Sequence, residues 1–571
     1  MKTVVALMSI VLAITFVALR SDDTPAVYPK PRDFPITMCG SAWIDAMNFG
    51  TPVTLIDGLG TLHYRINTRD SLAQKFFDQG LRLIYAFNHV EALRAFKEAS
   101  RLDPSCAMAW WGQALTLGPN INDWNPKDRE EMAMQAINKA KELSAGAKQS
   151  SQKEKDFIIA LASRYDGKVH DDREPLNVAY RDAMEKLSKK YPADPEALVL
   201  YADAIMTSMP WDYWNKDGSP KNLTSSARVA LESAIKKYPR HPGAHHMYIH
   251  LVEASNKPGD AHKSAEFLET AMPSAGHIVH MPSHIYARTG EYERSNNSNR
   301  LAIKADEEFL SRSDDQGLYR IGYYPHNIDF LAYGTLMNGQ SETAITVANK
   351  LAYHVKAIET VVPAYYDYYF NAPIIAFVRY GKWSDVLALP VPDDKNYHTS
   401  AIHHYARGTA FLRTKNITEA KRELSKLDSI SKLDTLKTIY AFFNSTEQIV
   451  KVAADLLKGE VLINEGKLDE GLSALRQAVA NEDDLRYNEP PDWRLPARHF
   501  LGAALFEAGR YADAQKVFED DLFKNPENGW ALKGLLNCHQ KSGQTTEALQ
   551  VEKRLSAAWS KGDVTIPSSR F

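Results

Sequence analysis

The most constraining feature of this chain is a ladder of small and apolar residues that recurs at fixed spacing. Ala92, Phe96, Ala99 and Pro104 follow one another at intervals of 4, 3 and 5 residues, and Gly80 precedes Ala92 by twelve. Small residues let two helix backbones approach closely, while Phe or Leu fills the groove beside them. The same ladder returns at Ala227, Leu231, Ala234 and Pro239; at Gly459, Gly471, Leu475 and Ala478; and at Gly502, Ala514, Phe518 and Pro526. The pattern predicts a series of helical hairpins.

This ladder resembles the tetratricopeptide repeat (TPR), a helix-turn-helix unit of about 34 residues. A single unit cannot bury its apolar face, so such units stack into arrays. The resemblance implies an all-α fold, an α-α superhelix or TPR solenoid of roughly ten to twelve helical hairpins with a concave groove. The predicted units lie near residues 73–106, 107–145, 160–192, 193–241, 242–275, 276–309, 325–358, 367–400, 401–434, 452–485, 495–528 and 529–562.

Length implies either several domains or a repeat array, because 571 residues that are 44% apolar are too many for one compact core, and the ladder favours the array. The predicted organisation has a signal peptide or N-terminal anchor, an N-terminal extension, a TPR array with the histidine cluster described below, degenerate TPR-like hairpins and C-terminal TPR units. These parts span residues 1–20, 21–70, 71–309, 310–480 and 481–571, respectively.

The N-terminus indicates export to the periplasm or the extracellular space. Lys2 is followed by an uncharged, mostly apolar stretch from Thr3 to Leu19, which Arg20 ends. This is the pattern of a signal peptide. The nearest small-x-small cleavage site, Thr24 to Ala26, is poor, so an uncleaved membrane anchor is the alternative. No other association with a membrane is expected.

The charge balance limits the kinds of binding partner, and the cysteine count limits the number of disulfides. Lys and Arg total 68 and Asp and Glu total 71, a formal net charge of -3 with no long run of one sign. This balance argues against a nucleic-acid partner. The three cysteines, Cys39, Cys106 and Cys538, are scattered and allow at most one disulfide.

Histidines cluster on matching positions of two consecutive predicted units. The chain has only 18 histidines in 571 residues. His246, His250 and Glu253 are spaced by 4 and 3 residues, which places them on one stripe of one helix. The next unit contributes His277, His280 and His284, and the unit after it contributes His326 and Asp329.

The TPR resemblance implies that these positions lie on the inner face of the first helix of each unit. First helices of successive units pack about 8 to 10 Å apart, so imidazoles of both units are able to converge on one ion. The predicted metal ligands are His246, His250, His277, His280, His284 and His326. Glu253 and Asp329 are predicted to act as a ligand, as a carboxylate that orients a histidine, or as a catalytic general base.

Pro282 leaves the geometry of the second stripe open. Proline removes a backbone N–H donor and disfavours the helical region for the preceding Met281. The helix either kinks there or begins at Pro282. In the second case His277 and His280 lie on an approach loop, and His280 and His284 are not a helical pair.

The remaining histidines and the inserted segments have simpler interpretations. His245 and His404 fall on packing positions and are predicted to be core, whereas His241 and His262 are predicted to lie on the surface. His403 and Arg407 are either a surface pair or a second, weaker grouping in which Arg407 contacts an anionic group of a substrate. Trp211 and Trp214, in the insertion 209–222, either cover an exposed core end or edge a ligand site. Glu489 to Trp493 is interpreted as a rigid structural elbow because of its two prolines.

Two functions from different classes are compatible with the sequence. The first is an exported, metal-dependent protein, with catalysis of an unknown reaction as one form of it. An imidazole-rich set without thiolates suits copper, zinc or iron, and a small molecule or peptide would occupy the groove. The second is a non-catalytic TPR scaffold that binds a protein or peptide partner, with the histidines making it sensitive to pH.

Overall fold

The computed structural model describes residues 52–123, 125–146, 150–313, 317–359, 363–390, 392, 396–440 and 442–571. All of them belong to one compact unit that spans residues 37–571. The predicted signal segment, residues 1–20, lies outside the described residues, as do Cys39 and the first part of the N-terminal extension.

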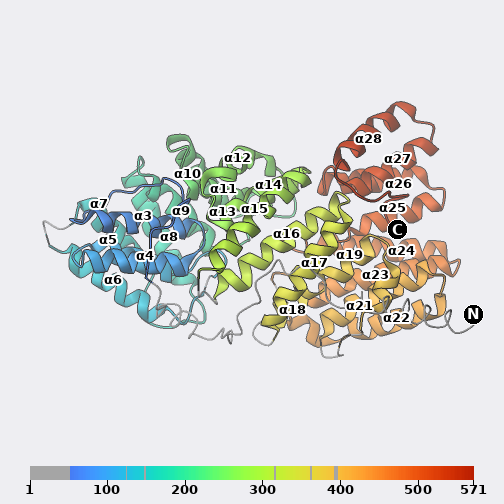
Figure 1. The fold of residues 1–571 in the computed structure, drawn as a ribbon, viewed down its shortest axis with the longest axis horizontal. Helices are drawn as coiled ribbons and strands as arrows, with labels where there is room; N and C mark the ends of the chain where they lie inside the picture. Colours follow the sequence, from blue (N-terminus) through green and yellow to red (C-terminus); the bar gives the residue numbers. More distant parts are fainter. Residues whose placement is uncertain are drawn as a thin grey trace, which may run out of the picture. The chain divides into compact units, whose positions relative to one another are not determined.

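Antiparallel helical hairpins follow one another along the described chain (Figure 1). The N-terminal hairpins pair α3 (Ser71–Tyr85) with α4 (His89–Leu102), α5 (Ala107–Leu117) with α6 (Glu130–Ser144), α7 (Gln152–Ala162) with α8 (Glu174–Lys190), and α9 (Pro195–Ser208) with α10 (Thr224–Lys237). The central hairpins pair α11 (Pro242–Val252) with α12 (His262–Ala271), α13 (Gly276–His280) and α14 (Pro282–Thr289) with α15 (Tyr292–Leu310), and α16 (Tyr324–Met337) with α17 (Ser341–Val355).

The C-terminal part continues the same arrangement. Here α18 (Pro363–Phe370) and α19 (Ala372–Arg379) precede the short α20 (Trp383–Ala388), and further hairpins pair α21 (Tyr397–Arg413) with α22 (Ile417–Ser431), α23 (Thr446–Asn464) with α24 (Leu468–Asp484), α25 (Ala497–Glu507) with α26 (Tyr511–Lys524), and α27 (Gly529–Lys541) with α28 (Thr545–Ala558). Short helical turns are η1 (Pro258–Ala261), η2 (Tyr319–Tyr323), η3 (Lys356–Ile358) and η4 (Asp434–Thr438). Within the described ranges no β-strand forms, and only isolated bridges such as Asn120 with Asp123 occur. The predicted all-α hairpin solenoid is confirmed.

Close backbone contact at the predicted ladder positions explains the fold. A Cβ atom on Gly80 of α3 would lie 2.7 Å from the ring of Phe96 on α4, which is closer than any side chain tolerates. Gly112 of α5 presses on the same ring from the next hairpin. Gly502 and Gly534 enclose Phe518 in the same way near the C-terminus. Each Phe therefore fills a groove that two glycines leave open, as the ladder predicts.

One predicted unit starts too late along the chain. The unit expected at 160–192 begins inside α7, which starts at Gln152. Its start is fixed by a capping box: Ser151 Oγ accepts the backbone N–H of Glu154, and the Glu154 side chain accepts the backbone N–H of Ser151. This Ser-x-x-Glu signal is present in the sequence and marks the true helix start.

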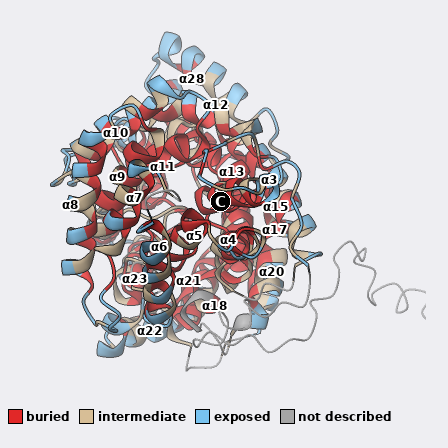
Figure 2. Ribbon diagram, turned by 90° about the vertical axis from the view of Figure 1, so that its left-hand side faces the viewer, coloured by how far each residue is buried: buried red, intermediate tan, exposed pale blue. Residues whose placement is uncertain are grey.

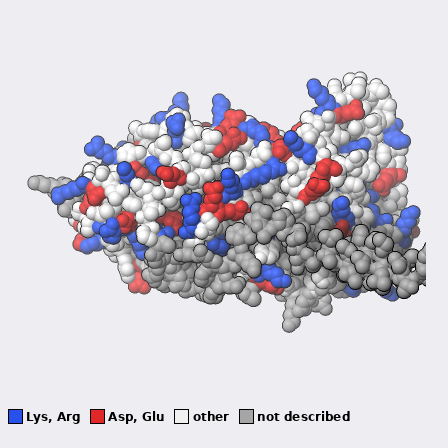
Figure 3. Space-filling model, in the orientation of Figure 1, with Lys and Arg blue, Asp and Glu red and all other residues white. Residues whose placement is uncertain are grey.

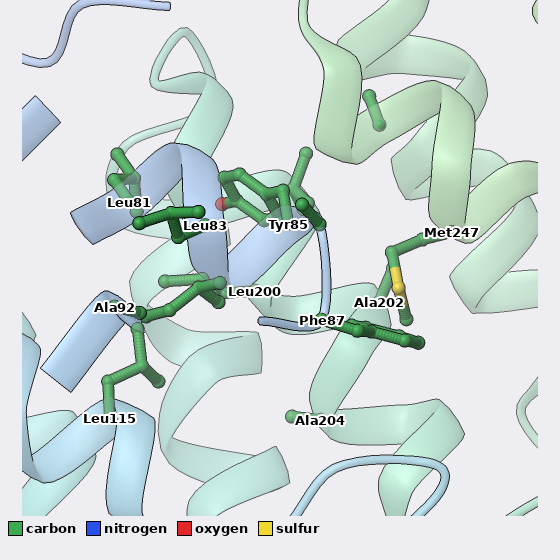
Figure 4. Packing of buried hydrophobic residues seen from close by; sticks show 14 of the residues in the cluster. Leu81, Leu83, Tyr85, Phe87, Ala92, Leu115, Leu200, Ala202, Ala204 and Met247 are labelled. Atoms are coloured by element: carbon green, nitrogen blue, oxygen red, sulfur yellow. The ribbon is translucent and has the colours of Figure 1, made fainter. Parts of the chain in front are cut away.

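Burial follows the stacking of the hairpins. Figure 2 shows buried residues where helices face one another and exposed residues toward the outside. One large apolar cluster runs through the N-terminal and central hairpins and includes Tyr85, Phe87 and Met247. Figure 4 shows Tyr85 and Phe87 where the chain leaves α3, near Met247 of α11. This packing brings the end of α3 against the histidine-bearing helix α11.

The described surface carries mixed charge. In Figure 3, Lys and Arg are interspersed with Asp and Glu on the visible described face, without a broad region of one sign. Among the described residues, no helix combines the length and the apolar character that crossing a bilayer requires.

Candidate metal centre

Three successive hairpins bring the six predicted histidines together. His246 and His250 lie on α11, and Glu253 directly follows that helix as its C-cap. Pro242 begins α11, and its first turn is closed by His241, whose Nδ1 accepts the Ala244 N–H at 3.1 Å. The next hairpin contributes His277 and His280 from α13 and His284 from α14, and α16 contributes His326.

Pro282 does not break the second stripe. Although α14 begins at Pro282, Met281 has helical dihedral angles, φ -51° and ψ -36°. The backbone therefore continues in helical conformation from α13 into α14. His280 and His284 keep their helical relationship, and their Nε2 atoms lie 2.7 Å apart.

The six side chains divide into two groups of three by the proximity of their nitrogens. The first histidine group is His246, His250 and His277, and the second histidine group is His280, His284 and His326. Within each group, one nitrogen of every ring lies within 4.8 Å of the other two. All of these residues are buried except His326, which is intermediate.

Outer partners fix the tautomers of the first histidine group. His246 Nδ1 lies 2.6 Å from the Tyr85 carbonyl oxygen, and His250 Nδ1 lies 2.9 Å from Glu253 Oε1. Both acceptors lack a hydrogen, so each Nδ1 donates and each Nε2 presents a lone pair. Among the described residues, His250 Nε2 and His277 Nδ1 have no hydrogen-bond partner, while His277 Nε2 faces His246 Nε2 at 3.1 Å.

The second histidine group is anchored in the same way. His280 Nδ1 lies 2.7 Å from Asn299 Oδ1, and the amide of Asn299 is oriented by its Nδ2 donating to the Ser295 carbonyl at 2.9 Å. His280 therefore donates through Nδ1 and presents its Nε2 lone pair. His284 Nδ1 donates to Glu253 Oε2. The two Nε2 atoms that face each other at 2.7 Å need a proton or a metal cation between them.

Two carboxylates determine the electrostatics around His284. Burial alone would lower the pKa of His284, but the nearby carboxylates of Glu253 and Glu489 outweigh it and raise the pKa to about 10. Although burial opposes it, contact with His284 and His250 lowers the pKa of Glu253. Burial and the nearby charge of Glu253 raise the pKa of Glu489 to about 8.

The other histidines of the cluster are held neutral. Burial, reinforced by neighbouring histidines, lowers the pKa of His246, His277 and His280 well below the usual value. Burial also lowers the pKa of His326 to about 3. Neutral imidazoles with free lone pairs are the form of histidine that binds metal ions.

Each histidine group is covered by one phenylalanine. The ring centroid of Phe87 lies 4.5 Å from His246 and 5.1 Å from His277 in the first group. The ring centroid of Phe330 lies 4.6 Å from His284 and 4.9 Å from His280 in the second group. Phe87 adopts a left-handed backbone conformation, φ 54°, which is uncommon for a bulky residue and is maintained by its packing. Such apolar covers exclude water and strengthen interactions within a metal site.

A groove of about 1070 Å³ adjoins the second histidine group. Its lining includes Phe330 and Glu489, which also contact the cluster, and the aromatic residues Trp211, Trp214 and Tyr487. Trp211 stands edge-on to His250, with ring centroids 5.1 Å apart. The insertion 209–222 and the segment 482–493 therefore form a groove whose wall is shared with the histidine cluster.

Glu489 belongs to the site, which corrects its interpretation as part of a structural elbow. Its Oε2 lies 2.7 Å from His284 Nδ1, but the N–H of that nitrogen is directed at Glu253. Both oxygens of Glu489 are buried and lack a hydrogen-bond partner within the described part of the chain. Glu253, His284 and Glu489 form a third, overlapping set of candidate ligands.

Asp329 does not join the cluster as expected. Its Oδ2 accepts a hydrogen bond from Arg494 Nη2 at 2.7 Å, and both side chains are buried. Burial raises the pKa of Asp329 to about 6 despite the nearby Arg494. The carboxylate that does orient histidines is Glu253, the other predicted candidate.

Several expectations about other histidines are decided by burial. His245 and His404 are buried as predicted, with partners Ser264 and Glu423. The surface assignment is wrong for His241, which is 2% exposed and bonds Glu196, and for His403, which is 5% exposed. His241 is buried because its ring caps α11 instead of extending into solvent.

Sequence reasoning missed the residues that fix the histidine rings. The Tyr85 carbonyl, Asn299 on the outer helix α15 and Phe87 come from positions with no chemical motif. Glu489 lies in an insertion whose position relative to the hairpins no periodicity indicates. In the sequence, only the acidic side chain of Glu489 and its position in a proline-rich interruption of the repeats indicated a role in the site.

The fold and its ladder define a class: an all-α protein of stacked helical hairpins with a histidine cluster on successive first helices. A sequence model described as tetratricopeptide repeat matches residues 77–117 and 501–563. These segments contain the Gly80 and Phe96 contact and the Gly502 and Phe518 contact. The chain therefore contains tetratricopeptide repeats in these two segments.

Comparisons with other proteins add no functional relative. No curated protein sequence matches the chain. Among solved structures, human IFIT1, a dimer with m7Gppp-AAAA, is similar at 12% identity and a TM-score of 0.32, with 86% of this chain and 91% of that chain covered. The APC/C hetero-tetramer Cut9-Hcn1 is similar at 12% identity and a TM-score of 0.28, with 85% and 73% covered. Both likenesses are too distant to carry an argument about ligands, and the predicted absence of a nucleic-acid partner stays a prediction.

Proposed function

We propose that this protein binds transition-metal ions in its histidine cluster and uses them on a small-molecule or peptide ligand that enters by the adjoining groove. One observation carries the proposal. Four of the six imidazoles donate through Nδ1 to a fixed acceptor and turn their Nε2 atoms inward, into the cluster. Metal-binding histidines are typically oriented in this way by carboxylates and carbonyl groups.

Inward-turned nitrogens in a buried cluster need a proton or a cation between them. The proton that His284 holds lies in the 2.7 Å space between its Nε2 and that of His280, where a metal ion would replace it. His250 is 2% exposed, and its Nε2 has no hydrogen-bond partner among the described residues. A buried polar atom without a partner destabilises a protein by about 1 to 3 kcal/mol. A metal ion held by these nitrogens would remove that penalty.

The ligand set favours copper, zinc or iron. Every candidate ligand is an imidazole or a carboxylate, and the described cysteines, Cys106 and Cys538, are free thiols outside the candidate ligand sets. Imidazole suits these three metals, whereas magnesium and calcium require oxygen ligands. Such an ion polarises a bound carbonyl or activates a bound water.

Glu253 is a positioning residue in this scheme. Its two oxygens accept hydrogen bonds from His250 and His284, and it is fully buried. Both carboxylate oxygens are thus engaged in holding rings. Of the two carboxylates beside His284, Glu489 is the one that also lines the groove and is placed to meet a ligand there.

Metal content tests the proposal. The protein is stripped with a chelator, reloaded separately with Cu(II), Zn(II) or Fe(II), desalted and measured by inductively coupled plasma mass spectrometry. We expect near-stoichiometric metal in the wild type and less in His250→Ala and His284→Ala. His404→Gln is the matched control, because His404 is also buried and bonded to a carboxylate but belongs to neither histidine group. Wild-type protein that takes up none of the three metals would disprove the proposal.

The groove itself supports a second candidate, a scaffold that binds a peptide. Its aromatic residues and its mixed charges, such as Lys216, Arg486 and Asp484, suit an extended polar segment. If the correctly folded protein binds no metal, this function is the one that remains. A peptide-array screen in which Trp211→Ala and Trp214→Ala lose the captured sequences would support it.

The proposal includes export of the protein from the cytoplasm. The apolar segment after Lys2 and its poor cleavage site indicate a secreted chain or one that stays attached by an N-terminal anchor. Expression of the full chain with a C-terminal tag, followed by fractionation and N-terminal sequencing, distinguishes a cleaved soluble form from an anchored one. Full-length protein recovered from the cytoplasm would contradict export.

A further inference from the structure

The histidine cluster has two centres of convergence. His246 and His277 face each other through Nε2 within the first group, and His280 and His284 do so within the second group. Between the groups the rings meet with centroids 5.5 Å apart for His250 and His284. His250 and His284 therefore pack ring against ring where the two groups meet. The close approaches between Nε2 atoms lie within each group and not between the groups.

Each group also has its own supporting residues, which anchor two of its three rings. The first group has the Tyr85 carbonyl, Glu253 Oε1 and the ring of Phe87, and the second group has Asn299, Glu253 Oε2 and the ring of Phe330. A single-ion site would need only one such set. Three imidazoles are the protein ligands of many catalytic sites that keep a further position open.

Glu253 joins the two groups symmetrically. Its Oε1 accepts from His250 of the first group, and its Oε2 accepts from His284 of the second group, so one buried carboxylate fixes a ligand of each. This carboxylate also places a negative charge against one histidine of each group. Such charge reduces the repulsion between two cations held close together.

We infer, on the basis of the proposed function, that the cluster is a dinuclear centre, with one transition-metal ion in each group of three histidines. The three imidazoles of each group would hold one ion, and two ions held side by side would supply Lewis-acid chemistry to the same ligand. Paired ions of this kind clamp one reacting group from two sides. His326, the most exposed of the six, and Glu489 place the second ion nearer to the groove.

Stoichiometry tests this inference. The full chain, stripped of metal, is titrated with Zn(II) by isothermal calorimetry and reloaded with Cu(II) for mass spectrometry. We expect two ions per chain in the wild type, one in His277→Ala, one in His326→Ala, and none retained after desalting when both substitutions are combined. These two histidines are chosen because, among the described residues, no carbonyl or carboxylate anchors their rings from outside the cluster, so their loss disturbs the fold least.

Spectroscopy supplies a second readout, which begins with the wild type. Two Cu(II) ions in adjoining sites couple magnetically, so the wild type loaded with two equivalents gives less electron paramagnetic resonance intensity than its copper content requires. His277→Ala and His326→Ala should each give the full signal of an isolated Cu(II). One ion per chain in the wild type, lost equally in both variants, overturns the dinuclear centre and leaves the proposed function standing. No metal in the wild type overturns both.

Discussion

Glu489 lies against His284, with Oε2 and Nδ1 2.7 Å apart, although the two residues belong to opposite halves of the sequence. The contact joins the groove to the histidine cluster, because Glu489 lines the groove while His284 belongs to the second histidine group. The insertion that carries Glu489 thereby becomes part of the site instead of a spacer between repeats.

Replacing the carboxyl group of Glu489 should weaken metal binding. In Glu489→Gln the side chain keeps its shape but is no longer able to ionise or to act as a carboxylate ligand beside His284, so we expect affinity for Zn(II) to fall by about 10- to 100-fold. Competition with a chromophoric chelator measures the change. Asp484→Asn is the control, because Asp484 lines the same groove but is exposed and paired with Lys216 at 2.7 Å. Equal losses in both variants would show a general effect of surface charge.

Asn299 offers a change confined to one histidine group. Asn299→Ala removes the acceptor that holds His280 Nδ1 at 2.7 Å and leaves the anchors of the first group intact. We expect the weaker of two Zn(II) affinities to fall by about tenfold or more, with the other affinity unchanged. Calorimetric titration resolves the two steps. A parallel fall of both affinities would mean that the groups do not act as separate sites.

Gly276 is required by close packing at the start of α13. A Cβ atom there would collide with Asp306 Oδ1 and lie 3.0 Å from the Ala302 carbonyl oxygen. Gly276→Ala should therefore destabilise the protein by about 1 to 3 kcal/mol and reduce metal uptake, because His277 and His280 lie on the displaced turn. Urea denaturation and metal content measure the two effects. Gly259→Ala is the control, since its nearest neighbour would be a methyl group of Thr289 at 3.8 Å.

The repeat ladder predicts the fold well because it depends on local, periodic contacts. Gly80 and Phe96, or Gly502 and Phe518, meet within a single hairpin, so their spacing alone reveals the contact. The histidine stripes are similar, since His246 and His250 share one helix and their matching positions repeat in the next unit. The grouping of six histidines was predictable for this reason.

The division into two groups and the identity of the outer partners were not predictable. Tyr85 contributes a backbone carbonyl, which leaves no trace in residue type, and Asn299 lies on an outer helix that the inner-face rule ignores. Asp329 lies at a position where the inner-face rule predicts a site residue, yet its carboxylate pairs with Arg494 instead. Which carboxylate reaches a histidine depends on how an insertion folds back, and no periodic pattern encodes that.

Asp306 should make stability depend on pH. Burial raises the pKa of Asp306 to about 7, although hydrogen bonds from Tyr319 and Asn327 favour the charged form. The folded state therefore holds a proton that the unfolded state has released between about pH 4 and pH 7, so this group's contribution to stability falls as pH rises across that window. Below about pH 4 the cost of burying a charged Asp306 carboxylate is absent, and above about pH 7 that cost applies in full.

The matched variant isolates this contribution from the other acidic groups. Asp306→Asn stays neutral and keeps an oxygen that accepts from Tyr319, so the difference in unfolding midpoint between variant and wild type should grow from pH 4 to pH 7 and then level off. Thermal denaturation followed by circular dichroism measures both proteins at each pH. A difference that does not change with pH would contradict the raised pKa.

Asp329 and Arg494 should behave as a structural ion pair. They meet at 2.7 Å with side chains 1% and 6% exposed, and the Arg494 guanidinium also lies 4.8 Å from the ring centroid of Tyr368. Breaking a buried pair from one side leaves an uncompensated charge, so Arg494→Met should destabilise the protein by about 3 to 5 kcal/mol. The double variant Asp329→Leu with Arg494→Met should recover most of that loss, as urea denaturation would show.

Because the Asp329 carboxylate is paired with Arg494, Asp329→Asn should keep the wild-type metal content. Loss of metal in that variant would show that Asp329 takes part in the site.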